Sequence, residues 1–148
     1  MADLLSAADR ACRDQGRTLT AARRRVLELV CASHVALGAY DILAILNKGG
    51  GRVAPVAVYR ALDFLIEMGL VHRLASRNAF VACARPAASH GAQFLICDGC
   101  GTVAEMADRE IEAAVAGGAR RAGFALRMPM VEITGLCPQC QGCESRDG

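Results

Sequence analysis

The sequence predicts an α+β fold, with a winged helix-turn-helix domain at residues 1–83 and a small α/β domain at residues 93–148. Three observations predict this organisation. Four segments with apolar residues at helical spacing come first, and two short β-rich runs follow them. Residues 84–92 (ARPAASHGA) are small, contain Pro and Gly, and show no periodicity, which indicates a hinge between domains. The remaining residues contain strand-like and helix-like segments next to two C-x-x-C pairs.

The composition predicts a globular, cytoplasmic protein that does not enter a membrane. Hydrophobic residues make up 53% of the chain and charged residues 22%. Every apolar stretch is far shorter than the roughly 20 residues that cross a bilayer, and the opening MADLLSAADR lacks a charged-then-apolar leader. The net charge of +2 divides unevenly, since residues 1–83 hold 11 basic against 7 acidic residues and residues 84–148 hold 6 against 8. This asymmetry favours a first domain that faces nucleic acid.

Apolar periodicity predicts three helices in the first third of the chain. The first covers residues 3–15 and ends at Gly16. Thr20 is suited to cap the second helix. The third covers residues 39–47 and ends at the GGG run of residues 49–51. The buried stripe of the second helix is predicted to consist of Val26, Leu27, Leu29 and Val30.

Basic residues occupy the opening turns of the second predicted helix. Arg23 and Arg24, followed by Arg25, lie where cations oppose the helix macrodipole. This position suggests that they bind a partner outside the chain, such as DNA. A solvated charged face is the alternative for each of them.

The fourth predicted helix (PVAVYRALDFLIEM) begins at Pro55 and ends before Gly69. At 100° per residue, Arg60 stands about 200° from Leu62 and therefore points away from the core. An exposed Arg on a helix that follows another helix fits the recognition helix of a helix-turn-helix, where guanidinium can bind guanine O6 and N7. Tyr59 could contact a thymine methyl group or a phosphate. A plain surface Arg beside a half-buried Tyr is the alternative. The core arc of this helix consists of Val58, Leu62, Leu65 and Ile66.

The runs LVHRLA and NAFVAC predict a hairpin, and a hairpin after a helix-turn-helix is a wing. In the second domain, QFLIC and TVAEM predict another hairpin. Residues 108–122 predict a helix that Asp108 opens, and residues 124–134 predict a returning strand. A sheet of three short strands with one helix is too small for a good core, so a metal ion and a partner chain are expected to stabilise it.

Two C-x-x-C pairs predict a structural zinc site. One pair lets two thiolates bind an ion from a tight turn, and a second pair completes the tetrahedral four-sulfur shell that zinc favours. Disulfides or buried thiols are the alternatives, but nothing in the sequence directs the chain to an oxidising compartment. The four residues are Cys97, Cys100, Cys137 and Cys140.

Other potential metal ligands lie near the predicted hinge. His72 lies in the first wing strand and Cys83 ends the second, so antiparallel pairing makes them plausible co-ligands. His90 lies in the hinge, and Glu105 follows the first cysteine pair. These four offer a mixed nitrogen, sulfur and oxygen set that suits tetrahedral zinc, although periodicity alone does not single them out. His34 has no such neighbours and is expected to be packed or solvated.

Several longer runs resemble the ferric uptake regulator superfamily, most closely its zinc uptake regulator branch. The resemblance extends from about Leu19 to Cys140 and includes LGAYDILAIL, APVAVYRALDFLIEMGLVHRLASRNAFVAC, SHGAQFLICDGCGTVAEM and LCPQC. It implies a homodimer that binds double-stranded operator DNA through a winged helix. It also implies a dimerisation domain at residues 93–148 held by a four-cysteine zinc, and a second zinc per protomer that acts as corepressor at the domain junction.

The resemblance assigns roles to individual residues. The regulatory zinc ligands would be His72, Cys83, His90 and Glu105. Tyr59 and Arg60 match the recognition helix, and Tyr40 matches a further DNA-contacting position. Iron-sensing relatives carry HHDH before the first C-x-x-C, whereas only His90 remains here, and the soft Cys83 thiolate favours zinc over Fe(II). The three cysteines expected to pack or lie idle are Cys12, Cys31 and Cys143.

The expected function is zinc-responsive regulation of transcription, mainly repression of zinc uptake genes. A regulator of the same fold that senses iron, manganese or peroxide is the nearer alternative. A zinc-containing thiol enzyme is the more distant one, because the chain contains no H-x-E for a deaminase and no βαβ setting for a thioredoxin-like C-x-x-C. Neither catalytic residues nor a small-molecule substrate are expected.

Overall fold

The computed structural model describes residues 2–86 and 91–144. The chain forms two compact units, Met1–Ala88 and Ser89–Gly148, which are treated separately below. The boundary between them falls inside the segment predicted to be a hinge. Within the described residues, no helix has the length and apolar character needed to cross a membrane.

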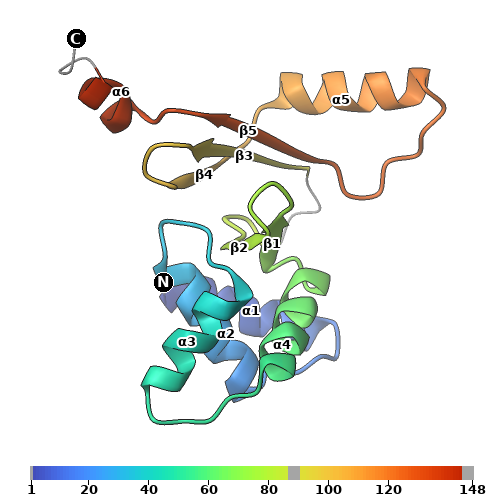
Figure 1. The fold of residues 1–148 in the computed structure, drawn as a ribbon. Coiled ribbons are helices and arrows are strands. Elements are labelled where there is room, and N and C mark those ends of the chain that lie inside the picture. The colour runs from blue at the N-terminus through green and yellow to red at the C-terminus, as the bar shows by residue number, and fades with distance from the viewer. Residues whose placement is uncertain (1, 87–90, 145–148) are drawn as a thin grey trace. The chain divides into compact units, whose positions relative to one another are not determined.

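The first unit contains four helices and a hairpin (Figure 1). Their bounds are α1 Ala2–Asp14, α2 Ala21–Ala32, α3 Ala39–Lys48, α4 Pro55–Glu67, β1 Val71–Leu74 and β2 Ala79–Ala82. The Thr20 side chain caps α2 by accepting the Arg23 N–H, as predicted. Pro55 opens α4, where its missing N–H costs nothing, and Gly69 follows the helix at φ +67°, a conformation that glycine adopts without strain.

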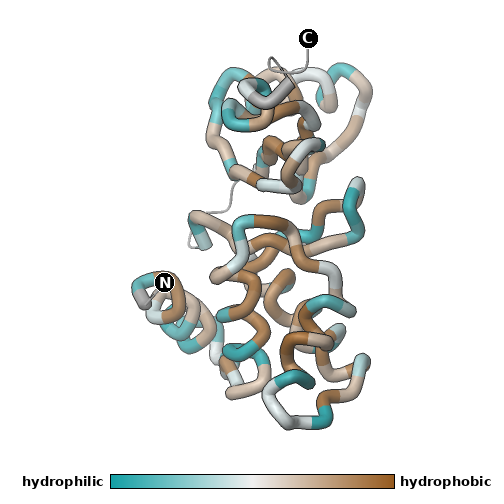
Figure 2. Tube along the Cα trace, turned by 60° about the vertical axis from the view of Figure 1, so that its left-hand side comes forward, coloured by the Kyte–Doolittle hydropathy of each residue, from teal (hydrophilic) through white to brown (hydrophobic). Residues whose placement is uncertain are grey.

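The core of this unit lies between α2, α3, α4 and the hairpin. Val26, Leu27 and Val30 of α2 are buried, as predicted, and α4 packs against them. Leu29 and Ile66 are only partly buried, at the margins of the predicted stripes. Figure 2 shows hydrophobic segments of the helices gathered in the interior of the unit. The fully buried positions of α4 include Val58, Leu62 and Leu65.

The hairpin pairs β1 with β2 in antiparallel register, with His72 opposite Val81 and Leu74 opposite Ala79. Leu37 adds an isolated bridge to Phe80. Asn78 in the connecting turn has φ +46°, which Asn tolerates better than most residues. The first unit therefore has the helix-turn-helix and wing that the sequence predicts.

The second unit contains a three-stranded sheet in the order β4-β3-β5. Its elements are β3 Ala92–Cys97, β4 Val103–Met106, α5 Arg109–Arg121, β5 Met130–Gly135 and α6 Pro138–Glu144. β3 pairs antiparallel with β4 and parallel with β5. The predicted cap of α5 is confirmed, because the Asp108 side chain accepts the N–H groups of Glu110 and Ile111.

Two details of the second unit differ from the sequence-based prediction. The strand predicted over residues 124–134 begins only at Met130, which pairs with Ala92, the first residue of β3, and among the described residues no strand pairs with residues 124–129. Pro129, which lacks an N–H, immediately precedes the strand. The helix α6 was not predicted. Its apolar residues are too few to show a period, although Pro138 is a common first helical residue.

Candidate metal centre and DNA interface

The four predicted cysteines converge on one point in the second unit. Cys97 ends β3, Cys100 lies in the turn after it, Cys137 precedes α6 and Cys140 lies within α6. Their four sulfur atoms all lie within 4.8 Å of one another. A tetrahedral zinc with sulfurs at about 2.3 Å requires sulfur–sulfur distances of about 3.8 Å. The Cys100 and Cys137 sulfurs are 3.8 Å apart, so the cluster fits zinc.

The backbone around the cluster is shaped for this convergence. The Gly101 N–H donates to the Cys97 carbonyl at 2.9 Å, and Gly101 itself has φ +76°. A Cβ atom on Gly99 would lie 2.9 Å from the Cys140 sulfur. The first C-x-x-C turn therefore accepts the second only because residue 99 has no side chain.

Hydrogen bonds prepare some of these sulfurs for a cation. The Cys137 N–H donates to the Cys97 sulfur at 3.3 Å, and this bond is the main cause that lowers the pKa of Cys97 to about 6. A hydrogen bond with the Thr102 hydroxyl lowers the pKa of Cys100. Hydrogen bonding to Cys137 and to the other two sulfurs raises the pKa of Cys140 to about 12. A bound divalent cation favours the thiolate form of its sulfur ligands.

The disulfide alternative is not observed among the described cysteines. Seven of them carry free thiols, including all four of the cluster. Cys12 is buried and Cys31 partly buried in the first unit, where burial raises the pKa of both thiols. Such thiols are poor nucleophiles and poor ligands, in keeping with the packing role predicted for them.

Two of the predicted regulatory ligands lie together in the first unit. A ring nitrogen of His72 and the sulfur of Cys83 are within 4.8 Å of each other. The wing pairing causes this, because the Cys83 N–H donates to the Leu70 carbonyl just before β1. Glu105 lies on β4 of the second unit, opposite Phe94, and His90 lies outside the described residues. The complete four-residue site therefore stays a prediction.

The residues predicted to contact DNA through the helix-turn-helix are accessible. Arg60 is exposed on α4, and the neighbouring Tyr59 is 43% exposed. Tyr40, in the first turn of α3, is 70% exposed. These side chains are available to a ligand, but their contact with DNA stays a prediction.

Arg23 and Arg24 have partners inside the first unit. Arg24 forms an ion pair with Asp9 of α1. The Arg23 guanidinium lies 3.6 Å from the centre of the Phe64 ring and donates to the Thr18 carbonyl at 2.7 Å. These contacts fix α1 and the following loop against α2 and α4. They account for cations at a helix N-terminus without DNA, and the proposed DNA contacts of both residues are untested.

A winged helix-turn-helix unit combined with a four-cysteine cluster that could hold a metal ion is typical of metal-dependent transcription regulators. Residues 14–134 match the model of the ferric uptake regulator family, to which this chain belongs. The family that the sequence resembles is thus confirmed.

Two relatives within the family have been compared with this chain by sequence identity. The zinc uptake regulation protein of Escherichia coli (strain K12) is 38% identical over 146 residues, which cover 97% of this chain and 84% of that protein. The ferric uptake regulation protein of Legionella pneumophila is 32% identical over 130 residues, covering 87% and 95%.

The fold of this chain also matches solved structures of zinc uptake regulators. A zinc uptake regulator complexed with zinc and DNA is 38% identical and matches with a TM-score of 0.90, covering 97% of this chain and 96% of that one. The holo form of XcZur is 39% identical and matches with a TM-score of 0.86, covering 95% and 98%.

Proposed function

We propose that this protein is a zinc-responsive transcriptional regulator, mainly a repressor, that binds palindromic operator DNA as a homodimer and controls zinc uptake genes. The observation that carries the proposal is the likeness, over nearly the whole chain, to a zinc uptake regulator complexed with zinc and DNA. The proposal places the protein in the cytoplasm and assigns it no enzymatic activity and no small-molecule substrate.

The proposal requires two zinc ions per protomer with different tasks. The structural zinc would bind Cys97, Cys100, Cys137 and Cys140 permanently. The regulatory zinc would bind His72 and Cys83 of the first unit, His90 of the hinge and Glu105 of the second unit. The imidazole–thiol pair in the wing supports this assignment, since a soft sulfur ligand favours zinc over Fe(II).

Ligands drawn from both units and the hinge would let zinc occupancy control DNA binding. One ion held by all of them restricts the angle between the units, and in a dimer this angle sets the separation of the two recognition helices. Successive major grooves lie about 34 Å apart, so few angles allow both helices to dock. Shifting such an equilibrium from 1:99 to 99:1 requires about 5.5 kcal/mol, and zinc sites provide roughly 10–16 kcal/mol.

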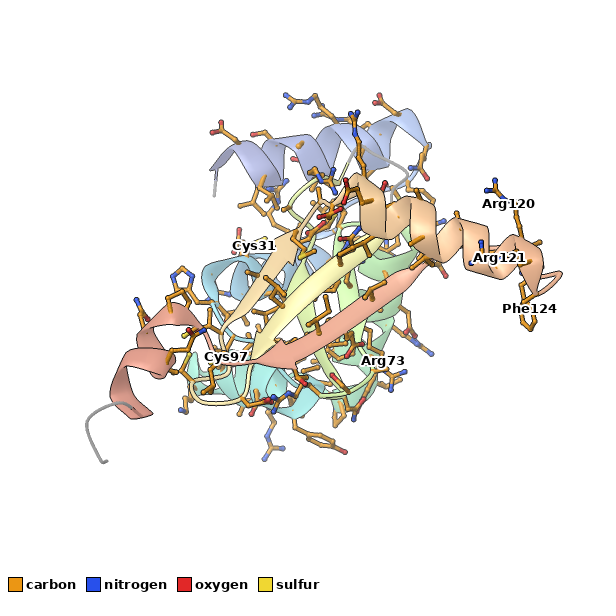
Figure 3. The ribbon with its side chains drawn as sticks, turned by 90° about the horizontal axis from the view of Figure 1, so that it is seen from above. Cys31, Arg73, Cys97, Arg120, Arg121 and Phe124 are labelled. Carbon is orange, nitrogen blue, oxygen red and sulfur yellow. The ribbon has the colours of Figure 1, made fainter. Side chains whose placement is uncertain are left out.

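Features of the second unit support a homodimer. No residue of α5 is buried within its own chain, and β5 is an edge strand. A cavity of about 270 Å³ opens on the sheet beside Leu95 and Ile133. Phe124 is 72% exposed and Met128 70% exposed, and Figure 3 shows Phe124 at the end of α5 remote from Cys97. A second copy of this unit is the simplest cover for this much apolar surface.

The nearer alternative keeps the fold and changes the signal to iron, manganese or peroxide. The similarity to a ferric uptake regulation protein at 32% identity favours this reading. The 38% identity to the zinc uptake regulation protein of Escherichia coli (strain K12) and the sulfur ligand offered by Cys83 favour zinc.

The decisive experiment measures operator binding by fluorescence anisotropy with zinc, Fe(II) or Mn(II) added at buffered free concentrations. We expect the wild-type protein to bind the operator only when zinc is added. We expect the His72→Ala variant to remain a folded dimer but to fail to bind the operator even with zinc. His34→Ala is the matched control, because His34 is exposed and has no role in the proposed site. Unchanged zinc-dependent binding of His72→Ala would refute the site, and a response to Fe(II) alone would refute the zinc signal.

A further inference from the structure

The last residue of α3 and the loop that follows it, with the sequence KGGGR at residues 48–52, are held at both ends by hydrogen bonds. The Asn47 side chain accepts the Val53 N–H at 2.8 Å, and the Asn47 carbonyl accepts the Gly50 N–H at 3.3 Å. These bonds tie the loop to the end of α3 and to the residues that open α4 (Figure 1). We call residues 48–52 the glycine loop.

Most basic side chains of the first unit are neutralised or held internally. Arg24 pairs with Asp9, and Arg25 pairs with Glu28 at 3.5 Å. Arg17 pairs with Glu67 at 3.0 Å. Arg23 and Arg73 are held by the Thr18 carbonyl and the Asn78 side chain, respectively. These residues stabilise the fold, and their charges are already partly engaged.

The two basic residues of the glycine loop differ from this pattern. Lys48 and Arg52 are both exposed, and within the described part of the chain neither forms an ion pair or a side-chain hydrogen bond. Arg60, on the helix that follows the loop, is likewise exposed and forms no ion pair or side-chain hydrogen bond within the described residues. The same holds for Arg10 and Arg85, but these two lie in other parts of the sequence. Lys48, Arg52 and Arg60 are therefore three exposed cations that lie close in sequence to the start of α4.

The glycines of the loop are not all required by the fold. Gly50 has φ +85°, which explains glycine there. Gly51 has no such φ, and an added Cβ would meet nothing within 4 Å. An added Cβ on Gly49 would lie 3.5 Å from the Leu46 carbonyl oxygen, an ordinary contact. Glycine at these two positions keeps the outer surface of the loop free of side chains, which allows another molecule to approach the backbone closely.

We propose that the glycine loop is a second DNA contact, which binds a backbone phosphate beside the groove that α4 occupies. Lys48 and Arg52 supply the positive charge, and the bare backbone of Gly49 to Gly51 lets the phosphate come close. The inference rests on the proposed function. It assigns positioning on the DNA to the loop and leaves base discrimination to α4.

The test is the salt dependence of DNA binding, measured by fluorescence anisotropy with saturating zinc on operator and on random duplex of equal length. The plot of log K against log salt has a negative slope. Loss of one phosphate contact makes this slope shallower by about 0.9, or by about 1.8 in a dimer that carries the change twice. We expect this decrease for Lys48→Ala and for Arg52→Ala, with equal fold losses on both duplexes. Gly51→Ala is expected to weaken binding at unchanged Tm.

Arg109→Ala is the matched control, because Arg109 is exposed in the second unit and its removal makes the same charge change. If Lys48→Ala and Arg52→Ala have the slope and affinity of this control, the inference is wrong. Losses confined to the operator would also overturn it, since they would indicate base contacts. Failure of the wild-type protein to bind operator with zinc would instead refute the proposed function.

Discussion

Gly99 leaves the space in which the two C-x-x-C pairs come together. Its missing side chain leaves room for the Cys140 sulfur. Gly99→Ala places a Cβ at 2.9 Å from that sulfur, so one C-x-x-C turn has to move. We expect a loss of about 1–3 kcal/mol in the stability of the zinc-loaded second unit, measured as earlier zinc release to a chromogenic chelator during urea unfolding. Gly142→Ala, with open space around its added Cβ, should release zinc as the wild type does.

Arg60 tests the recognition helix at the level of a single side chain. Because it is exposed on α4, Arg60→Ala should leave the fold intact. If it binds guanine bidentately, the ratio of operator to random-DNA affinity falls by the equivalent of about 1–3 kcal/mol. Competition anisotropy with both duplexes measures this ratio. An equal loss on both would show that Arg60 contacts phosphate.

Residue-level roles could be predicted only where spacing along the chain carries the information. The C-x-x-C pairs and the orientation of Arg60 follow from turn and helix geometry. The partners of the other arginines do not, because Arg24 and Asp9 are 15 residues apart and Arg17 and Glu67 are 50 apart. Periodicity relates only neighbours on one helix, so it could not reveal that Arg23 stacks on Phe64.

At the scale of elements, α4 has two faces with different tasks. Leu62 on the inner face is 1% exposed, so Leu62→Ala leaves a cavity in the core and should cost about 2–5 kcal/mol of unfolding free energy. Val56 is 55% exposed, and Val56→Ala should have little effect on stability. Urea unfolding followed by circular dichroism compares the two. Similar losses would mean that α4 is not packed as described.

The elements with a clear period or cap were predictable, and the others depended on pairing. Thr20 and Asp108 cap the helices that the sequence assigns to them. By contrast, the start of β5 is set by its partner β3, which begins at Ala92. Residues 124–129 were predicted to belong to the strand, but strand formation requires a paired neighbour, and none of the described residues pairs with them.

At the scale of the whole molecule, the structural zinc should hold the second unit together. The sheet has three short strands, and α5 contributes no buried residue. Removal of zinc by a strong chelator, or Cys97→Ser, should therefore unfold this unit and yield monomers, with loss of DNA binding. Sedimentation velocity and far-UV circular dichroism provide the measurement. His72→Ala, which spares the cysteine cluster, should remain a dimer, and a metal-free protein that stays dimeric and folded would contradict the expectation.

The two-unit organisation was foreseeable from composition, because small residues separate a basic part from an acidic one. The family resemblance carried the assignment of the regulatory ligands, and the structure adds that His72 and Cys83 meet across the wing. Glu105 and His90 belong to other parts of the chain, so no local pattern links them to that pair.

The lack of buried positions in α5 has a consequence for how such a protein is made. In the proposed homodimer a second copy covers the exposed apolar side chains of α5, so the formation of a mature protein would depend on protein concentration. Newly synthesised chains at very low abundance would then stay unpaired and inactive at promoters even in zinc-replete cells. Expression level would thus set a threshold for gene control in addition to the one set by metal supply.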